Sequence, residues 1–411
     1  MPTILISGAS IAGPTLAYWL AAAGWTPTVI ERAPALRREG QNIDIRGAAR
    51  EVIRRMGLED RIRAAHTGEL GTQFIGVHGE VKASFAAGKT DTAGATAELE
   101  ILRGELAGIL VDSTADATEY VFGDQITALA ADADGVTVSF ERGDDRRFDL
   151  VVIAEGMRSR TRPMVFGAAP KLRPLGMYTA YFTIPRTPTD TRHWRWYNAV
   201  GGRNVSLRPD NHGTTQATLS FLSAPMGYEE LSQAEQKALL RRRFGDVGWE
   251  APRVLAALDD ASLYFDALGQ VHAPAWSAGR IAMIGDAAYC ASPISGMGTS
   301  LAIVGAYVLA GELATRSTHT EAFAHYERRM RPYVEQAQKL PPGAPRLANP
   351  KTRAGIALFH LAVSIAASRL ATRLGELGIA AKLFAPPADA IDLPDYPFQT
   401  PPRPSLRASP R

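Results

Sequence analysis

The sequence contains almost no cysteine: Cys290 is the single one among 411 residues. One thiol excludes an internal disulfide and is typical of a reducing compartment, so we expect a cytoplasmic protein. The eight histidines show no HExxH spacing, and no second cysteine stands beside the first. Because these usual ligand patterns are missing, we expect no metal site. Cys290 itself is interpreted as a small residue that fills a tight turn.

The chain also lacks a strong charge of one sign and a long apolar run. The formal net charge is only +3, and much of the excess lies in Arg241–Arg243 and in the C-terminal tail. This distribution excludes a basic face for nucleic acid. The apolar stretch 354–367 is bracketed by arginines and is too short to span a bilayer, so we predict a packed helix there. Strand-like sequence begins at Thr3, which leaves no room for a signal peptide.

The pattern of apolar residues changes along the chain. Thr3–Ser7 is a strand-like run, residues 11–23 have helical spacing, and Pro27–Glu31 is again strand-like. This order predicts a βαβ unit of a parallel sheet. Residues 174–222 instead hold alternating β-type runs separated by Gly, Pro and Asn turns, which predicts an antiparallel sheet.

We therefore predict an α/β protein with a Rossmann-like nucleotide-binding domain, a second domain built on an antiparallel sheet, and a C-terminal helix. The first domain is expected to be discontinuous. The predicted boundaries are 1–72, 98–173 and 260–341 for the first domain, 73–97 and 174–259 for the second, 350–385 for the C-terminal helix, and 386–411 for a proline-rich tail that is extended or disordered.

The first glycine motif is Gly8-Ala9-Ser10-Ile11-Ala12-Gly13. It follows a strand and opens a helix, which is the context of the G-x-G-x-x-G dinucleotide fingerprint. Gly8 would make the tight turn, and Gly13 would let the helix pack closely on the strand. Ser10 replaces the middle glycine, but it is small enough to let a pyrophosphate approach the backbone. Glu31 ends the second strand, where a carboxylate accepts hydrogen bonds from an adenosine ribose.

A second element of this kind lies far along the chain. The apolar run 281–284 is followed by Gly285-Asp286, a turn of small residues, and glycines at 296 and 298. This layout suits a nucleotide cofactor held against exposed backbone N–H groups. Between the two elements, a buried strand ends in Glu155-Gly156. If two such distant elements serve one ligand, they imply a large extended cofactor such as FAD.

These three motifs, in this order, resemble those of the class A flavoprotein monooxygenases, the para-hydroxybenzoate hydroxylase-like group of FAD enzymes. The resemblance covers about residues 1–340. The family's middle motif is usually Asp-Gly and contacts both flavin and the nicotinamide cofactor, whereas this chain has the longer Glu155. The histidine that often follows Gly-Asp-Ala-Ala is Tyr289 here. The string around Arg46 and the C-terminal helix also resemble the tetracycline-inactivating branch.

The resemblance implies roles for single residues. Asp286 would contact the ribityl and ribose region of FAD, Arg46 would lie beside the flavin ring, and Arg103 would contact the FAD ribose and phosphate. The residues expected to bind the cofactor are Gly8, Ser10, Ala12, Gly13, Glu31, Arg32, Arg46, Arg103, Glu155, Gly156, Gly285, Asp286, Pro293, Gly296, Met297 and Gly298.

The implied activity is oxygen transfer. NADPH or NADH would reduce the flavin, O2 would add at C4a as a hydroperoxide, and one oxygen atom would pass to an aromatic or polyketide-type molecule, a tetracycline-like one included. The cofactor carries this chemistry, so the protein must orient it, exclude water and bind the substrate. The expected partners are therefore a small aromatic or polycyclic substrate and O2, with a monomer or homodimer as the assembly.

Substrate contacts are expected on one face of the 174–222 sheet. The aromatic candidates are Tyr181, Phe182, Trp194, Trp196 and Tyr197. Alternation places Trp194 and Trp196 on one face and Tyr197 on the other, but it leaves open which face looks inward. Arg46 and Tyr181 are the predicted catalytic residues.

Other interpretations stay open on the same fold. They are Baeyer–Villiger oxygenation, a flavin halogenase, a reductase, and an FAD-binding protein without turnover. Halogenases of this group carry Trp-x-Trp-x-Ile-Pro, and the nearest string here begins at Trp194 and lacks the Ile-Pro. This difference argues against halogenation.

Overall fold

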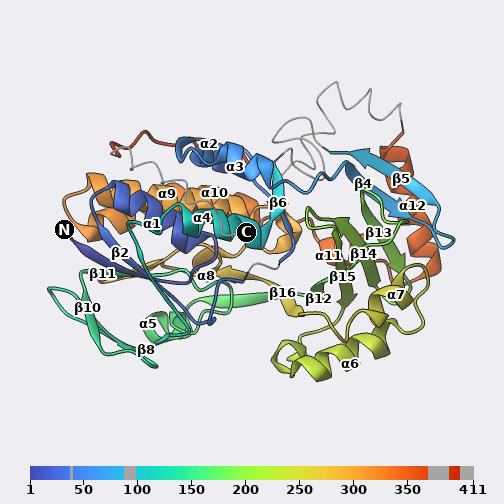
Figure 1. Cartoon of the computed structure of the whole chain (residues 1–411), viewed down its shortest axis with the longest axis horizontal. Coiled ribbons are helices and arrows are strands. Elements are labelled where there is room, and N and C mark those ends of the chain that lie inside the picture. The colour runs from blue at the N-terminus through green and yellow to red at the C-terminus, as the bar shows by residue number, and fades with distance from the viewer. Residues whose placement is uncertain (38–39, 88–98, 369–387, 399–411) are drawn as a thin grey trace.

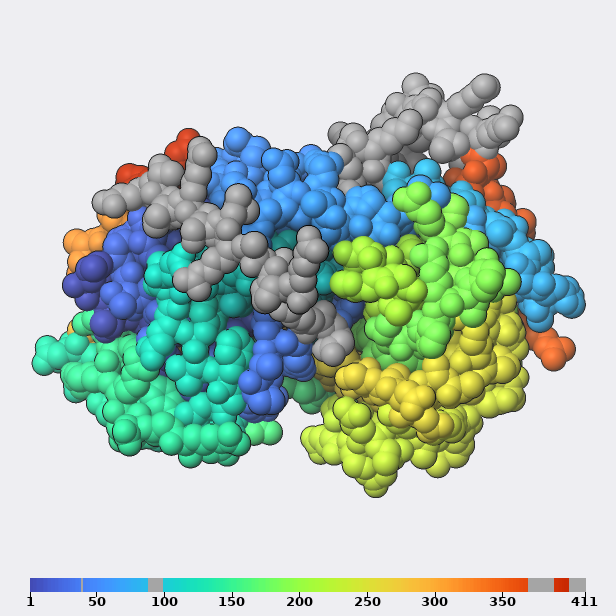
Figure 2. Space-filling view, viewed as in Figure 1, coloured from blue at the N-terminus to red at the C-terminus, as the bar shows by residue number. Residues whose placement is uncertain are grey.

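The computed structural model describes residues 1–37, 40–87, 99–368 and 388–398. Two lobes lie side by side and are joined by the long strands β12 (Lys171–Pro185) and β16 (Tyr264–His272) (Figure 1). In the space-filling view the lobes are separated by an indentation at the lower edge (Figure 2). The predicted fold class, a parallel sheet with helices plus a second sheet, is confirmed.

The first lobe is built on a six-stranded sheet in the order β17-β18-β11-β1-β2-β7. Its strands are β1 (Thr3–Ser7), β2 (Thr26–Glu31), β7 (Glu119–Phe122), β11 (Leu150–Ile153), β17 (Ser277–Ala278) and β18 (Ile281–Met283). All neighbours except β17 and β18 pair in parallel. The central strands are continuous apolar runs because both faces of such a sheet are covered.

Helices cover one face of this sheet (Figure 1). Helix α1 (Ala12–Ala22) follows β1 and completes the predicted βαβ unit. Helix α9 (Gly298–Thr315) packs against α1 and against α10 (His319–Gln338). Among the described helices, α9 alone is long and apolar enough to cross a membrane, but 72% of it is buried in this lobe, as in a core helix.

Shorter elements complete the first lobe. The helices are α2 (Ala48–Arg55), α3 (Glu59–Ala64), α4 (Arg103–Asp112), α5 (Arg162–Phe166) and α8 (Asp286–Tyr289). The strands are β3 (Asn42–Asp44) paired with β6 (Glu100–Leu102), and the meander β8 (Ile126–Ala131), β9 (Val136–Phe140) and β10 (Arg146–Phe148).

The second lobe is built on a seven-stranded sheet in the order β16-β12-β15-β14-β13-β4-β5. Its remaining strands are β4 (Gly71–Ile75), β5 (Val81–Ala86), β13 (Trp194–Ala199), β14 (Arg203–Pro209) and β15 (Thr214–Leu222). The sheet is mixed rather than purely antiparallel, since β4 pairs in parallel with β13. The predicted boundary at residue 260 was wrong for β16, which pairs with β12 and so belongs to this sheet.

Helices α6 (Gln233–Phe244) and α7 (Ala251–Ala256) cover one face of the seven-stranded sheet, next to the short helix η1 (Tyr228–Glu230). Alternate residues of the strands point into an apolar cluster with these helices. Helix α6 begins with a capping box in which Ser232 and Glu235 satisfy each other's backbone N–H groups, which fixes its first turn.

The C-terminal part of the chain contacts both lobes. Helix α11 (Ala344–Ala348) lies against β12, and α12 (Arg353–Ala366) lies against β5. Residues 388–398 pack on the first lobe, where the Tyr396 hydroxyl donates to Glu312 Oε1 at 2.7 Å. The rest of the predicted helix 350–385 and of the proline-rich tail lies outside the described residues.

Candidate active site

The loops that follow β1, β2, β11 and β18 meet at one edge of the parallel sheet. These strands pair in parallel, so their carboxyl ends lie at the same edge. Hydrogen bonds hold the ends together: Gly8 N donates to Ile30 O at 2.7 Å, and Ile284 N donates to Ile153 O at 3.0 Å. Open α/β sheets bind their ligands at this edge. The fold thus brings together the three motifs that the sequence spreads over most of the chain.

The two glycines of the first motif lie where no side chain fits. A Cβ atom on Gly13 would stand 1.9 Å from Gly8 O, and one on Gly8 would stand 2.4 Å from Ala154 O. Gly8 also has a φ of 117°, which L side chains rarely adopt. The close approach of α1 to the β1 turn lets the first backbone N–H groups of the helix face the sheet edge.

Glu31 and Arg103 bind to this first turn. The Glu31 carboxylate accepts hydrogen bonds from Ala9 N at 3.0 Å and from Ala33 N at 2.9 Å. Arg103, at the start of α4, donates from Nη1 to Ser10 Oγ at 3.0 Å. An acid and a guanidinium therefore flank the glycine turn, where a ribose hydroxyl and a phosphate would each find a partner. Arg32 is exposed.

The Glu155 carboxylate is engaged by the protein itself. It accepts hydrogen bonds from Ser7 Oγ at 2.5 Å, Ser159 Oγ at 2.7 Å, and both Thr161 Oγ1 at 2.5 Å and Thr161 N at 3.0 Å. These contacts join the end of β1 to the loop after β11. The extra methylene relative to aspartate gives the carboxylate the reach to bind this loop. In this arrangement Glu155 holds the turn that carries Gly156.

The second nucleotide element packs directly against the first. Gly285 has a φ of 60°, and a Cβ atom there would stand 3.1 Å from Ala12 Cβ. Burial raises the pKa of Asp286, and its hydrogen bond with the Cys290 thiol opposes the rise. Burial also raises the pKa of the Cys290 thiol, with Asp286 adding to the effect, so the thiol stays protonated and is a poor nucleophile. The Tyr289 hydroxyl turns into the core, where it accepts from Tyr326 Oη at 2.9 Å.

Arg46 and the start of α9 lie together. The short helix η2 (Pro293–Ser295) leads through Gly296 and Met297 into α9. Ser300, in the first turn of α9, accepts from Arg46 N at 3.3 Å. The Arg46 side chain is buried and donates to Asp44 Oδ2 at 2.9 Å. The structure therefore brings Arg46 to the loop that was expected to lie under the flavin ring.

The arrangement fits an extended flavin nucleotide. Gly156 and Gly296 have φ values of 82° and 65°, and a Cβ atom on either would meet no other atom within 4 Å. Both glycines therefore border open space at the sheet edge, beside loops that offer backbone N–H groups. Glu31 and Arg103 lie at one end of this edge, and Asp286 lies near Gly298 at the other. Together these hydrogen-bond acceptors and donors match the sugar, phosphate and ring parts of FAD.

The second sheet resolves which aromatic residues can face a ligand. Phe182 and Tyr197 lie in the apolar cluster with α6 and α7, so their predicted role as substrate contacts was wrong. Strand pairing places Trp196 opposite Phe74 and Ser206, and Tyr181 opposite Thr218 and Tyr264. Trp194, Trp196 and Tyr181 therefore share the other face. This face is polar: it carries the buried residues Thr72, Thr179, Asn198, Asn204, Ser206 and Ser220.

The structure also reveals a charged cluster at the lobe junction, which no sequence motif indicated. Arg208 lies on the polar face, 4.5 Å from the centre of the Trp194 ring. It donates to Glu69 Oε2 at 2.7 Å and to Glu100 Oε1 at 3.3 Å. Burial raises the pKa of Glu100 to about 7, Arg208 opposes the rise, and Glu69 adds to it. These residues lie far apart in the sequence, so no local pattern indicates the cluster.

A comparison with protein families decides the identity. The model of the family described as "FAD binding domain" matches residues 1–340. The chain belongs to the FAD binding domain family. The predicted order of motifs therefore corresponds to a class A FAD monooxygenase, and FAD is its cofactor.

Several relatives of this FAD-binding protein are named monooxygenases. A flavin-dependent monooxygenase of Legionella longbeachae is 38% identical over 345 residues, 82% of this chain and 87% of that protein. The flavin-dependent monooxygenase eupH of a Phoma species is 34% identical over 429 residues, 96% of this chain and 97% of that protein. The protein is thus a flavin-dependent monooxygenase that acts on a small molecule.

Two solved structures of tetracycline destructases have the same fold as this chain. The tetracycline destructase Tet(55) has a TM-score of 0.77 and 34% identity, covering 96% of this chain and 98% of its own. Tet(51) has a TM-score of 0.78 and 30% identity, covering 96% and 99%. The resemblance to the tetracycline-inactivating branch therefore extends over almost the whole chain.

Proposed function

We propose that this FAD monooxygenase uses NADPH or NADH and O2 to hydroxylate an aromatic or polyketide-type molecule. Two electrons from the nicotinamide and two from the substrate C–H bond reduce O2. One oxygen atom enters the substrate and the other leaves as water, with one proton consumed. When bound, FAD supplies the hydride acceptor and the oxygen activation, and the protein supplies binding and orientation.

One observation carries the proposal: the flavin-binding loops and the polar face of the second sheet are joined at one lobe junction. The Asn42 side chain, on β3 of the first lobe, donates to Pro209 O on β14 at 3.1 Å. Arg208 on β14 in turn contacts Glu100 on β6. A buried polar sheet face, unlike an apolar core, suits a polyfunctional ligand because its groups need hydrogen-bond partners.

Single residues have defined tasks in this proposal. Ser300 binds the backbone N–H of Arg46 at the start of α9, and Asp44 binds its guanidinium, which can then stabilise negative charge on the flavin ring. Burial raises the pKa of Tyr181 to about 12, so its phenol stays protonated and can donate a hydrogen bond to a substrate oxygen.

The likeness to Tet(55) and Tet(51) makes tetracyclines the first compounds to test, followed by polycyclic phenols. Purified protein is expected to be yellow, to oxidise NADPH or NADH faster when the substrate is added, and to place one ¹⁸O atom in the product under ¹⁸O2. Mass spectrometry of the product measures the incorporation. Oxidation that gives only hydrogen peroxide with every compound would contradict the proposal.

Tyr181→Phe tests the assignment of the polar face. Removal of the hydroxyl is expected to raise KM for the substrate about fivefold, because one hydrogen bond contributes about 1 kcal/mol. FAD content and thermal stability should stay at wild-type values. Steady-state kinetics with the identified substrate give the measurement.

Phe182→Leu is the matched control on the opposite face of the same strand. Its side chain lies in the cluster with α6 and α7, so the change is expected to lower stability by about 1 kcal/mol and to leave KM unchanged. An effect on KM from Phe182 but not from Tyr181 would mean that the faces are assigned the wrong way round.

A further inference from the structure

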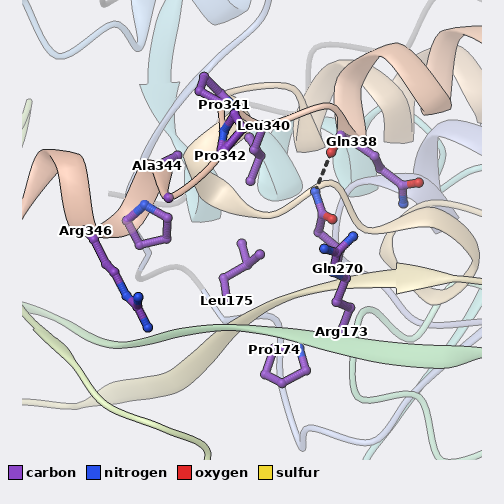
Figure 3. Close-up of a pocket in the computed structure, with 12 residues that line it drawn as sticks. Arg173, Pro174, Leu175, Gln270, Gln338, Leu340, Pro341, Pro342, Ala344 and Arg346 are labelled. Carbon is purple, nitrogen blue, oxygen red and sulfur yellow. Dashed lines mark hydrogen bonds between the residues drawn. The ribbon is translucent and has the colours of Figure 1, made fainter.

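A groove runs along the junction of the lobes beside α11. It consists of one cavity of about 370 Å³ and a second of about 360 Å³ that share Pro174, Leu175 and Arg346. In Figure 3 the segment 340–344 lies above the strand that carries Arg173 and Pro174, with the Leu175 side chain between them. The groove lies outside the motifs that bind FAD.

Local backbone features form the groove. The pairing of β12 with β16 shifts between Pro174 and Tyr178, and Gly176 has a φ of 72°. Such an irregularity bends a strand and redirects its side chains. On the opposite side, Pro341, Pro342 and Pro345 restrict the segment that leads into α11. The bend of β12 and the proline-rich segment thus shape the two walls of the groove.

The groove is positively charged. Arg173, Arg346 and Lys351 line the two cavities, and neither lining contains an aspartate or glutamate. None of the three side chains makes an ion pair within the described ranges. By contrast, two other arginines of this sheet are paired with acids: Arg195 on β13 binds Asp190, and Arg208 on β14 binds Glu69. Cations without a counter-charge in a groove attract an anionic ligand, and arginine forks suit phosphate in particular.

One wall of the groove is tied to the segment that leads into the flavin loop. Gln270 donates to Gln338 O at 2.9 Å, the bond drawn in Figure 3. The Gln338 amide in turn donates to Cys290 O at 3.1 Å. Cys290 lies three residues before Pro293, the first residue of η2. A ligand whose phosphates bind in this groove is therefore held next to the chain segment that carries the flavin.

We propose that this groove binds the phosphate groups of the reduced nicotinamide dinucleotide, with Arg173 and Arg346 as phosphate ligands and Lys351 adding charge. The inference rests on the proposed function, which requires a phosphate-bearing electron donor that the FAD motifs do not accommodate. The groove supplies charge and shape for a ligand that docks transiently, since its cations stay hydrated and reachable from solvent.

The test uses FAD-loaded protein and the variants Arg173→Gln, Arg346→Gln and the double variant. Titration calorimetry with NADP⁺ and NAD⁺ measures binding without turnover. Anaerobic stopped-flow mixing with NADPH and NADH measures flavin reduction. Each substitution is expected to raise Kd about tenfold, the worth of one charge-assisted hydrogen bond. Arg186→Gln is the matched control, because Arg186 is also exposed but lies at the far end of β12.

Two further measurements distinguish nicotinamide binding in the groove from the later reaction of the reduced flavin with O2 and substrate. Inorganic pyrophosphate is expected to compete with NADPH in the wild-type protein and not in the double variant. Enzyme reduced with dithionite should react with O2 and substrate equally in both, since this half of the reaction bypasses the groove. Wild-type Kd values in the double variant would overturn the inference, and so would a wild-type protein that no nicotinamide reduces. Failure of oxygen transfer in the dithionite-reduced protein would instead contradict the proposed function.

Discussion

Gly13→Ala is expected to purify without the yellow colour of bound FAD and to unfold at a lower urea concentration than the wild-type protein. The added Cβ atom would stand 1.9 Å from Gly8 O, a backbone atom that cannot rotate away as a side chain does. Either α1 must move off the sheet or the Gly8 turn must change shape. We expect a loss of about 3 kcal/mol in the free energy of unfolding, at the upper end for overpacking.

Gly108→Ala is the control for this substitution. Gly108 lies within α4, and a Cβ atom there would meet nothing within 4 Å. Alanine favours the helix, so this variant is expected to gain about 0.5 to 1 kcal/mol and to keep its FAD. Urea unfolding and the FAD absorbance of the purified proteins give both measurements. Wild-type FAD content in Gly13→Ala would contradict the close packing of α1 on the β1 turn.

Glu100→Gln is expected to gain stability relative to the wild-type protein as the pH rises. Burial raises the pKa of Glu100 to about 7, so the folded state holds a proton that the unfolded chain releases near pH 4.5. Between these two values the folded state binds more protons, and the free energy of unfolding falls as pH increases. From pH 5.5 to pH 8 the free energy of unfolding of the wild-type protein should fall by about 2 kcal/mol. The Glu100→Gln variant should not show this fall, because its glutamine is neutral at both pH values.

The surroundings of Glu100 explain why the pKa of this carboxyl is raised. Arg208 provides one positive charge between Glu100 and Glu69, and Asp44 is the cross-strand partner of Glu100. Thr67 and Asn42 donate hydrogen bonds to the two Glu100 oxygens. Burial disfavours the charged form of Glu100, and Glu69 shares the Arg208 cation with it, so Glu100 keeps its proton near neutral pH. Its ionisation would place excess negative charge at the lobe junction.

Glu119→Gln supplies the control for the pH series. Glu119 is half exposed, and its hydrogen bond from Arg146 holds the pKa of this carboxyl below its ordinary value. The contribution of ionised Glu119 to the free energy of unfolding is therefore complete above the ordinary pKa of a glutamate. It stays constant from pH 5.5 to pH 8. Urea unfolding at both pH values should show a growing difference from the wild-type protein for Glu100→Gln alone. Parallel pH profiles for Glu100→Gln and the wild-type protein would contradict the assigned protonation.

The first lobe could be predicted well because its signals are local. Gly8–Gly13 with Glu31 lie within one βαβ unit, and Gly285-Asp286 with the glycines of the α9 start lie within one short stretch of the chain. The backbone conformation that a nucleotide needs is encoded in those neighbouring residues. The seven-stranded sheet was harder, because alternation identifies strands without naming their partners. Strand β16 was assigned to the wrong lobe for this reason.

The sequence by itself determined the cofactor class and the presence of two sheets, because glycine turns and apolar periodicity act over a few residues. Only the tertiary structure decided which face of the second sheet packs against α6 and α7 and which face carries Tyr181 and the buried polar residues. Tyr181 and Phe182 are neighbours of similar character, and packing against α6 and α7 separates their roles. The Glu100–Arg208 cluster and the Arg173–Arg346 groove likewise exist only where distant segments meet, since burial and the field of unpaired charges depend on three-dimensional proximity rather than on spacing in the chain.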